Sequence, residues 1–197
     1  MLFAGLNLQA APKVTLPPAK VRKALQLDAF YQKHVDVGGL SIVSSKKVSD
    51  YALLEAAYLI GQMLGDRQDI LKAMAKNKVR FAIMAHNEYT TQIPEHSDLQ
   101  PRLYWNKRAR GLGATFERPA VSCGEENLLL YPKDPYSKEN ILIHEFAHAI
   151  HNMGLSKTDP TFDDRLEATY EAAVKQKLWK GKYAGRNHHE YWAEGVQ

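Results

Sequence analysis

The strongest constraint on this chain is an apolar segment of helical periodicity around position 144 that contains two histidines four positions apart. Residues 141–153 read ILIHEFAHAIHNM, and Gly154 follows directly. The apolar residues recur at the spacing of a helix that is buried along most of its surface. Asp134 and Ser137 offer capping chemistry before it, and glycine commonly follows the last turn of a helix. We therefore expect a buried helix that ends at Gly154.

The two histidines of this helix can bind one metal ion. Residues four apart lie on one face about one turn apart, so the imidazoles of His144 and His148 point the same way. Glu145 lies roughly 100° around the helix from His144, where it can touch a metal-bound water without ligating the metal. Zinc lowers the pKa of such a water towards about 7, and a neighbouring carboxylate can accept its proton. This composition gives the pattern by chance only about 0.04 times, so we interpret it as a zinc motif.

A catalytic zinc usually has three protein ligands, so a third must come from elsewhere in the chain. His151 is a poor candidate, because on a continuous helix it lies about 10 Å of rise beyond His144. The metzincin pattern is excluded, since it requires glycine at position 151 and histidine at position 154, and here the order is reversed. His188 and His189 lie on other faces of their turn, and we interpret them as exposed polar residues at a helix start.

A better donor lies in residues 190–194, which read EYWAE. The interval from His148 accommodates one loop, one helix and a return to the site. Glu190 and Glu194 are one helical turn apart on the same face, so one carboxylate can bind the metal while the other orients an imidazole N–H. Helix geometry alone permits either order. The alternative interpretation is a pair of solvated acids on a surface helix.

Two blocks, HEFAHAI at 144–150 and KYAGRNHHEYWAEGVQ at 182–197, resemble the lethal-factor-like branch of the gluzincin metallopeptidases, which includes the secreted Pro-Pro endopeptidases. The resemblance implies that Glu190 is the third zinc ligand and that Glu194 supports a ligand histidine. A family tyrosine seven residues before the ligand glutamate matches Tyr183, whose phenol would stabilise the oxyanion formed during peptide hydrolysis. The first 130 residues show no such resemblance, so the substrates of the family do not carry over.

The resemblance also implies a place for the substrate backbone. In HExxH peptidases an edge strand beside the active helix usually holds the substrate in an extended conformation. Residues 111–116 are our candidate for this strand, with Gly111, Leu112 and Gly113 as substrate-binding residues. The glycines at 111 and 113 do not indicate a phosphate loop, because no GK[ST] sequence follows them.

The resemblance and the apolar patterns together predict an α+β fold, a compact gluzincin-like domain in which a small mixed sheet packs against the HExxH helix and the C-terminal part is helical. Residues 1–19 are expected to form an extended arm and residues 20–197 a single catalytic domain. The terminal helix of the family continues further, which predicts truncation at the C-terminus. We expect further helices at 20–33, 48–64, 69–76, 160–178 and from 188, and strands at 40–43, 79–84 and 127–131.

Composition and charge argue against several other classes. The net charge is +4, but the basic residues are scattered. The densest cluster, Lys107, Arg108 and Arg110, has no basic helix or aromatic RNA-binding motif beside it, so no nucleic-acid partner is expected. No run of 18 apolar residues occurs, so we expect no membrane span. The single cysteine, Cys123, cannot form an internal disulfide, and we expect a buried structural thiol.

These observations predict a zinc-dependent endopeptidase that binds one Zn²⁺ per chain and hydrolyses a peptide or protein substrate as a monomer. A competing class is a non-peptidase zinc amidase, since deformylase-type sites use the same helix motif. Another is a non-catalytic module in which zinc only stabilises the fold. A protein ligand in the fourth position would favour the module, whereas an open position beside a free Glu145 favours hydrolysis. Residues 1–12 are interpreted as the remnant of a secretory signal, which predicts a secreted or extracytoplasmic location.

Overall fold

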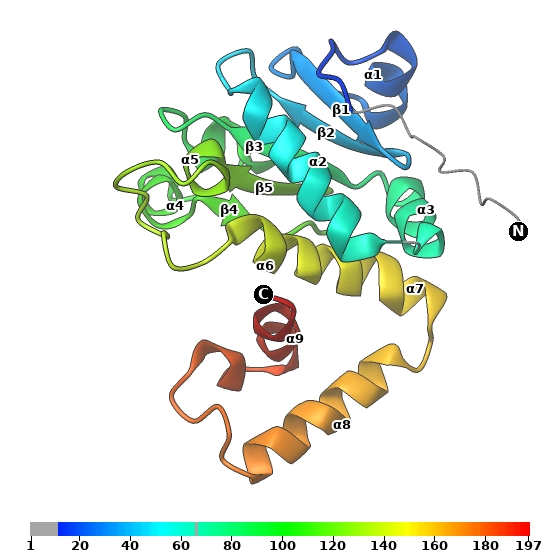
Figure 1. Ribbon diagram of the computed structural model, residues 1–197, viewed down its shortest axis with the longest axis vertical. Coiled ribbons are helices and arrows are strands. Elements are labelled where there is room, and N and C mark those ends of the chain that lie inside the picture. Colours follow the sequence, from blue (N-terminus) through cyan, green and yellow to red (C-terminus); the bar gives the residue numbers. More distant parts are fainter. Residues whose placement is uncertain (1–11, 66) are drawn as a thin grey trace, which may run out of the picture.

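A five-stranded mixed sheet in the order β1-β2-β3-β5-β4 forms the upper part of the computed structural model (Figure 1). The structure describes residues 12–65 and 67–197. The central strands β2 (Leu40–Ser44), β3 (Arg80–Met84) and β5 (Ala120–Gly124) are parallel and buried along their whole length. Strands β1 (Lys33–Val37) and β4 (Gly111–Leu112) pair antiparallel with them at the two edges.

The two faces of the sheet have separate hydrophobic cores, because successive residues of a strand point to opposite sides. In β3, Phe81 and Ile83 belong to the larger core, whereas Ala82 and Met84 belong to the smaller one. Parallel strands are stable only when both faces are covered, and these strands are covered on both. Cys123 of β5 is buried in the larger core as a free thiol, which confirms its expected structural placement.

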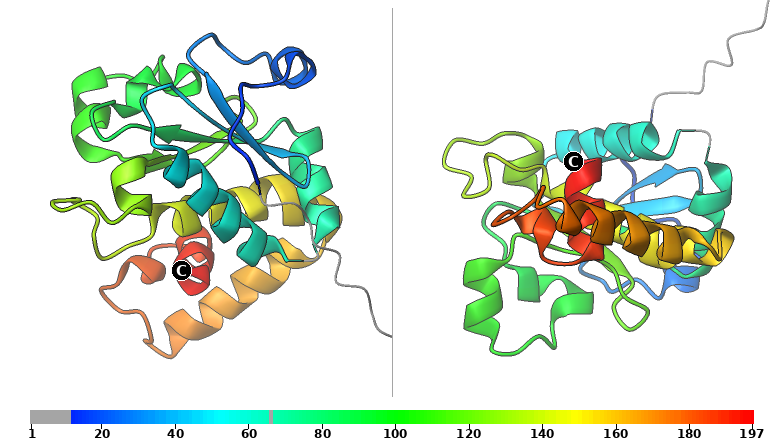
Figure 2. Two further views of the ribbon diagram at one scale, coloured as in Figure 1. Left: turned by 45° about the horizontal axis from the view of Figure 1, so that its top comes forward. Right: turned by 90° about the horizontal axis from the view of Figure 1, so that it is seen from below.

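Helices cover the larger core, and shorter segments cover the smaller one (Figures 1 and 2). The larger core is covered by α2 (Asp50–Leu64), α3 (Gln68–Lys76) and α6 (Ile141–Ala149). The smaller core is covered by α1 (Ala19–Leu25) and the short 3₁₀ helices η1 (Thr90–Gln92) and η2 (Pro94–His96). Helix α4 (Arg102–Arg108) precedes β4, and α5 (Glu125–Leu128) follows β5.

The C-terminal part is a helical layer beneath α6. Helix α6 continues through a π-helical turn, η3 (Ile150–Leu155), into α7 (Ser156–Thr158). The chain then turns into α8 (Phe162–Lys175), and η4 (Tyr183–Gly185) leads into α9 (His188–Val196). Figure 1 shows α8 leading away from the sheet and α9 returning to lie under α6. This return brings residues from the end of the chain beside the HExxH helix.

The predicted α+β class, the mixed sheet beside the HExxH helix and the helical C-terminal part are confirmed. The strand predicted at 127–131 is wrong, because α5 begins at Glu125 and Leu130 is a turn residue at φ 53° with 81% of its surface exposed. The helix predicted at 20–33 ends at Leu25, where Gln26 adopts φ 53°. Strands β1 and β5 and helix α4 were not predicted.

The predicted ends of the HExxH helix are also wrong. Its N-cap is Asn140, whose side chain accepts a hydrogen bond from the N–H of Ile143, rather than Asp134 or Ser137. Gly154 does not end the helix but lies within the π-helical turn. A methyl group at Gly154 would lie 2.7 Å from Cγ2 of Ile70, so this glycine permits close packing on α3 rather than a helix stop.

The N-terminal arm is only partly described. Thr15 forms an isolated antiparallel bridge with His34, so residues 12–18 run beside the edge of the sheet. The predicted signal remnant falls almost wholly within residues 1–11, which lie outside the described residues. Among the residues that are described, no helix is long and apolar enough to cross a membrane.

A buried histidine on the smaller core predicts how the stability of the fold depends on pH. His96 is 1% exposed, and its Nε2 lies 3.1 Å from the hydroxyl of Ser122. Burial lowers the pKa of His96 from 6.5 to about 4. An unfolded chain therefore binds a proton here below about pH 6.5 that the folded chain does not, so stability falls as the pH drops towards 4.

We expect the wild-type protein to lose about 2 kcal/mol of unfolding free energy through His96 between about pH 7.5 and pH 5. A His96→Gln variant has no group that titrates at this position, so its unfolding free energy should fall by about 2 kcal/mol less between the two pH values. This difference does not depend on how stable the variant is at neutral pH. Urea unfolding of both proteins at the two pH values measures the difference. Equal losses in the two proteins would contradict the prediction.

Candidate metal centre

The start of α6 is fixed by two asparagines that cap it from different directions. The side chain of Asn140 accepts a hydrogen bond from the N–H of Ile143 at 3.1 Å. The carbonyl of the Asn127 side chain accepts from the N–H of Ile141 at 2.8 Å. The amide of Asn127 also donates to the backbone carbonyl of Glu139 at 2.9 Å. Because these bonds satisfy N–H groups that a helix start leaves without partners, they set where the following histidines lie.

Helix α9 is docked on α6 by a partly buried tryptophan. The indole N–H of Trp192 donates to the backbone carbonyl of Ala147 at 2.8 Å. The Trp192 ring also packs edge-to-face on Phe162 of α8, with ring centroids 5.2 Å apart. The side chain of Asn187, the N-cap of this helix, accepts from the N–H of Glu190 at 2.9 Å. Glu190 therefore stands in the first turn of α9, opposite the histidines of α6.

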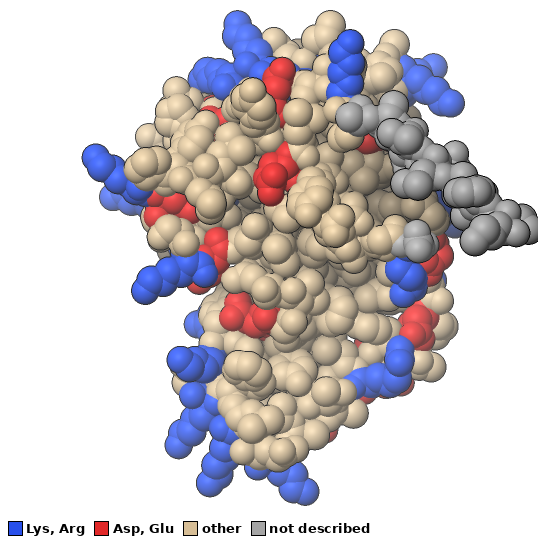
Figure 3. All heavy atoms as spheres, viewed as in Figure 1, with Lys and Arg blue, Asp and Glu red and all other residues tan. Residues whose placement is uncertain are grey.

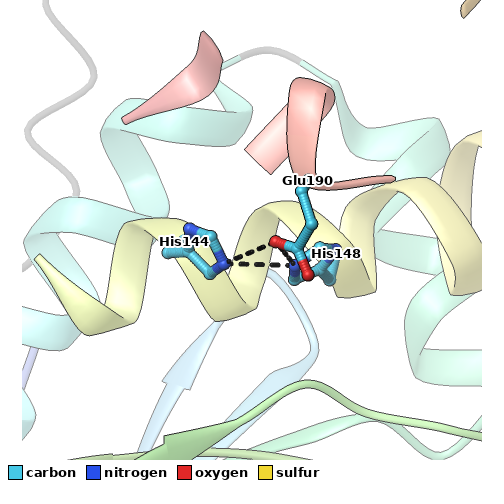
Figure 4. Close-up of side chains that lie close together, drawn as sticks. All are labelled: His144, His148 and Glu190. Atoms are coloured by element: carbon cyan, nitrogen blue, oxygen red, sulfur yellow. Dashed lines mark hydrogen bonds and ion pairs between the residues drawn. The ribbon is translucent and has the colours of Figure 1, made fainter. Parts of the chain in front are cut away.

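His144, His148 and Glu190 converge on one point (Figure 4). Their Nε2, Nε2 and Oε2 atoms form a triangle with sides of 3.2 Å between the histidines, 3.2 Å from His144 to Glu190 and 3.3 Å from His148 to Glu190. Oε2 of Glu190 is buried and receives no hydrogen bond. A buried carboxylate oxygen without a donor is unfavourable unless a cation or a proton accompanies it.

The triangle has the dimensions of one face of a zinc coordination tetrahedron. Donor atoms bound to tetrahedral zinc at about 2.0–2.1 Å lie roughly 3.3–3.4 Å from one another. The three sides observed here are 3.2 to 3.3 Å. Two imidazoles and a carboxylate are also a donor set of catalytic zinc sites. The residues present therefore fit a zinc ion in both chemistry and spacing.

Glu194 lies on the other side of His144. Its Oε1 is 3.2 Å from Nδ1 of that ring, whereas Glu190 faces Nε2. A carboxylate that accepts from Nδ1–H leaves Nε2 with a free lone pair, and this is how outer-shell groups orient metal-ligating histidines. The structure thus places the two glutamates at different nitrogens, which helix geometry alone did not determine.

Glu145 points to the neighbouring edge of the sheet. A methyl group at Gly113 would lie 3.4 Å from Oε2 of Glu145, so the carboxylate lies directly beside the backbone of Gly113. Burial, followed by the charge of Glu190, raises the pKa of Glu145 to about 7. Burial also lowers the pKa of His148 to about 4, with the charge of His144 as the second cause. Glu145 is therefore close to half ionised at neutral pH, while His148 keeps a free lone pair.

A cavity of about 440 Å³ opens beside the triangle. Gly111 and Leu112 of β4 line it, as predicted for an edge strand, whereas Gly113 touches Glu145 without lining the cavity. Sequence reasoning did not place seven further lining residues at the site, and four of these come from α4 and from the segment before α6. These four residues are Trp105, Arg108, Tyr136 and Glu139. Their positions in the sequence could have indicated this role, because they come shortly before the strand that carries Gly111 and the helix that carries His144.

Tyr183 lines the same cavity from the opposite side. Its ring centroid lies 6.0 Å from that of His144, and 41% of its surface is exposed. The guanidinium carbon of Arg186 lies 4.8 Å from the centroid of the Tyr183 ring, a cation–π distance that holds the ring in place. The cavity therefore joins Tyr183, Glu145 and the donor triangle.

The remaining histidines stay outside the triangle. His151 is 1% exposed, and its Nε2 pairs with Asp163 at 2.6 Å. Its Nδ1 lies 3.4 Å from Nδ1 of His189, which is exposed. His151 is thus a buried histidine whose Nε2 has a partner within the protein, rather than a third donor to the triangle.

Comparison of the chain with models of protein families gave no match, and neither did comparison with curated proteins. The gluzincin resemblance therefore stays a prediction.

Different positions of the two glutamates predict different effects on metal binding. We expect Glu190→Ala to release zinc, because two histidines cannot retain it against a chelator. Glu194→Ala should keep zinc with about 10–100-fold weaker affinity, since it removes only the partner of Nδ1. Chelator competition followed by elemental analysis measures the zinc that each variant retains. Glu139→Ala is the matched control, because this acid lines the cavity without pairing with a histidine. Zinc retained by Glu190→Ala but lost by Glu194→Ala would reverse the assignment.

Proposed function

We propose that this chain is a zinc-dependent endopeptidase of the gluzincin type. The observation that carries the proposal is the triangle of His144, His148 and Glu190 donor atoms, with sides of 3.2 to 3.3 Å, at the wall of an open cavity beside Glu145. His144, His148 and Glu190 would hold one zinc ion. Bound there, zinc supplies Lewis acidity, which polarises a carbonyl and makes a water molecule acidic near neutral pH.

Glu145 supplies the proton transfer. A general base works best when its pKa lies near the operating pH, and burial has raised the pKa of this carboxyl to about 7. The carboxylate accepts a proton as water attacks the scissile carbonyl and returns it to the leaving amine. Its contact with the backbone of Gly113 fixes the carboxyl group between β4 and the histidines.

Strand β4 and Tyr183 give the cavity two further functions. β4 pairs with β5 on one side only, so its free edge can hydrogen-bond an extended peptide as an added strand. The phenol of Tyr183 can donate a hydrogen bond to the oxygen of the attacked carbonyl as negative charge develops there. These features support hydrolysis of a backbone amide held along β4.

A structural zinc module requires a fourth protein ligand, and three donors converge within the described residues. This favours hydrolysis over the module. The zinc amidase differs from the endopeptidase only in substrate. Mass spectrometry of a peptide library incubated with the zinc-loaded protein tests the proposal, because internal cleavage is the expected result. Removal of terminal acyl groups without internal cleavage would instead identify an amidase. Monomeric state, extracytoplasmic location and lack of nucleic-acid binding stay predictions.

Replacement of the proposed base should separate chemistry from metal binding. We expect Glu145→Gln to retain zinc and thermal stability but to lose about 10²–10⁴ in peptide hydrolysis rate, because the amide cannot accept a proton. Glu139→Gln, an exposed acid at the same cavity, is the control and should stay within a few-fold of wild type. Full activity in a zinc-loaded Glu145→Gln protein would exclude the role.

The phenol of Tyr183 can be tested in the same assay. We expect Tyr183→Phe to lower kcat by roughly 10²–10³ with little change in KM, as found when one oxyanion donor is removed. The ring and its contact with Arg186 remain in this variant. An unchanged kcat would mean that Tyr183 serves only as a wall of the cavity.

A further inference from the structure

The segment 174–186, which we call the basic tip, joins the end of α8 to η4 and lies at the lower end of the molecule (Figure 1). It reads VKQKLWKGKYAGR and contains five of the 26 lysines and arginines but none of the 22 acidic residues. Without these five charges, the formal net charge of +4 would become −1. Figure 3 shows lysine and arginine side chains gathered at this end. The basic tip is thus a segment of 13 residues that carries five cations and no acid.

Apolar side chains are exposed among these charges. Val174, Leu178 and Trp179 are 49%, 55% and 48% exposed. Val174 and Trp179 line a surface hollow of about 350 Å³ together with Lys177 and Lys180. Large apolar groups that cluster at a surface usually mark a place where something binds. Here the apolar groups and the cations share one small area.

The backbone of the basic tip is held in a closed turn. Lys177, at φ 60°, donates from its N–H to the carbonyl of Val174 at 2.9 Å. The N–H of Lys182 donates to the carbonyl of Trp179 at 3.0 Å. A methyl group at Gly185 would lie 2.4 Å from that same carbonyl oxygen, so only glycine permits this close approach. These contacts fix the backbone that presents Trp179 outward.

We propose that the basic tip docks the protein on an anionic membrane surface. Trp179 and Leu178 enter the boundary between headgroups and acyl chains, and the lysines contact lipid phosphates. Tryptophan favours this boundary because its ring is apolar and its N–H is polar. Lysine can bury its aliphatic chain while its ammonium stays at the headgroups. Each basic residue near an anionic leaflet strengthens binding by about fivefold.

Other polyanions fit the basic tip less well. Nucleic acid binding explains the five positive charges but not the exposed Val174 and Leu178. Bases stack on aromatic side chains, and these two side chains are aliphatic. A stable protein interface usually involves about 20–30 residues on each side, more than the 13 residues of the basic tip. A lipid surface requires only a small group of apolar side chains surrounded by cations.

Docking through the basic tip would also orient the cavity. Tyr183 belongs to this segment and lines the cavity, and Arg186 packs on its ring. The opening beside Glu145 would therefore face material held at the membrane. The docking proposal itself does not depend on catalysis.

Sedimentation with lipid vesicles tests the proposal on the full chain. We expect the protein to sediment with vesicles of phosphatidylcholine and phosphatidylglycerol, and to stay in solution with phosphatidylcholine alone. High salt should release it, because it screens the lysines. Vesicles with brominated acyl chains should quench tryptophan fluorescence in the wild-type protein but not in Trp179→Ser.

Matched variants separate the basic tip from the rest of the surface. Lys177→Gln with Lys180→Gln should lower vesicle partitioning by about thirtyfold, and Trp179→Ser by about tenfold. Lys20→Gln with Lys23→Gln removes the same charge from exposed positions on α1, at the other end of the molecule (Figure 1). This control should lower vesicle partitioning by less than twofold. Tyr58→Ser is the control for an exposed aromatic, since 60% of Tyr58 is exposed on α2.

Three results would overturn the proposal. They are no sedimentation with anionic vesicles, equal losses in the α1 and basic-tip variants, and binding to duplex DNA that depends on Lys177 and Lys180 but not on Trp179. Circular dichroism and thermal melting of each variant show whether it is folded. Leu178→Gln, which keeps the tryptophan, replaces Trp179→Ser if that variant is unfolded.

Discussion

The candidate site depends on the docking of α9 against α6, because neither helix carries a complete set of donors. The hydrogen bond from the Trp192 indole to the Ala147 carbonyl joins the helix that carries Glu190 to the helix that carries the two histidines. One such bond contributes about 1 kcal/mol, and partial burial of the aromatic ring adds to this. Docking must offset a cost, since it brings the Glu190 carboxylate close to that of Glu145, whose pKa is raised first by burial and then by this charge. The apolar contact between the helices therefore offsets an electrostatically unfavourable site.

The sequence predicted the parts of the site that local periodicity determines. His144, His148 and Glu145 share one helix, so spacing alone placed them. Asn127 could not be predicted in its role. It holds the N–H of Ile141 and the carbonyl of Glu139 across a segment that has no regular pattern. Such contacts depend on tertiary packing, which overrides local propensity. For the same reason the apolar run at 127–131 suggested a strand, whereas the buried acids at 125 and 126 find their partners at Ser49, His86 and Arg110 elsewhere in the chain.

Buried acids illustrate this dependence further. Glu125 is 2% exposed and accepts hydrogen bonds from the N–H groups of Ser49 and His86, so one carboxylate joins the start of α2 to the end of β3. Glu126 pairs with Arg110 at 2.5 Å, directly before β4. Breaking a buried pair of this kind typically costs about 3–5 kcal/mol, because the remaining charge is left without a partner. The edge strand that lines the cavity thus begins directly after an arginine that this ion pair holds in place.

The histidines of the molecule show what distinguishes a candidate ligand from a structural residue. His151 is buried more deeply than His144, yet Asp163 accepts its Nε2–H and satisfies it. His144 instead has a carboxylate at each nitrogen, and the one at Nε2 is shared with His148. Protons on both Nε2 atoms would let the two rings donate to Oε2 of Glu190, but Nδ1 of His144 would then face the Glu194 carboxylate without a proton unless that imidazole were charged. A divalent cation would resolve this arrangement, because it bonds to all three lone pairs at once. It would also link α9 to α6, so that metal affinity and the docking of α9 would stabilise each other.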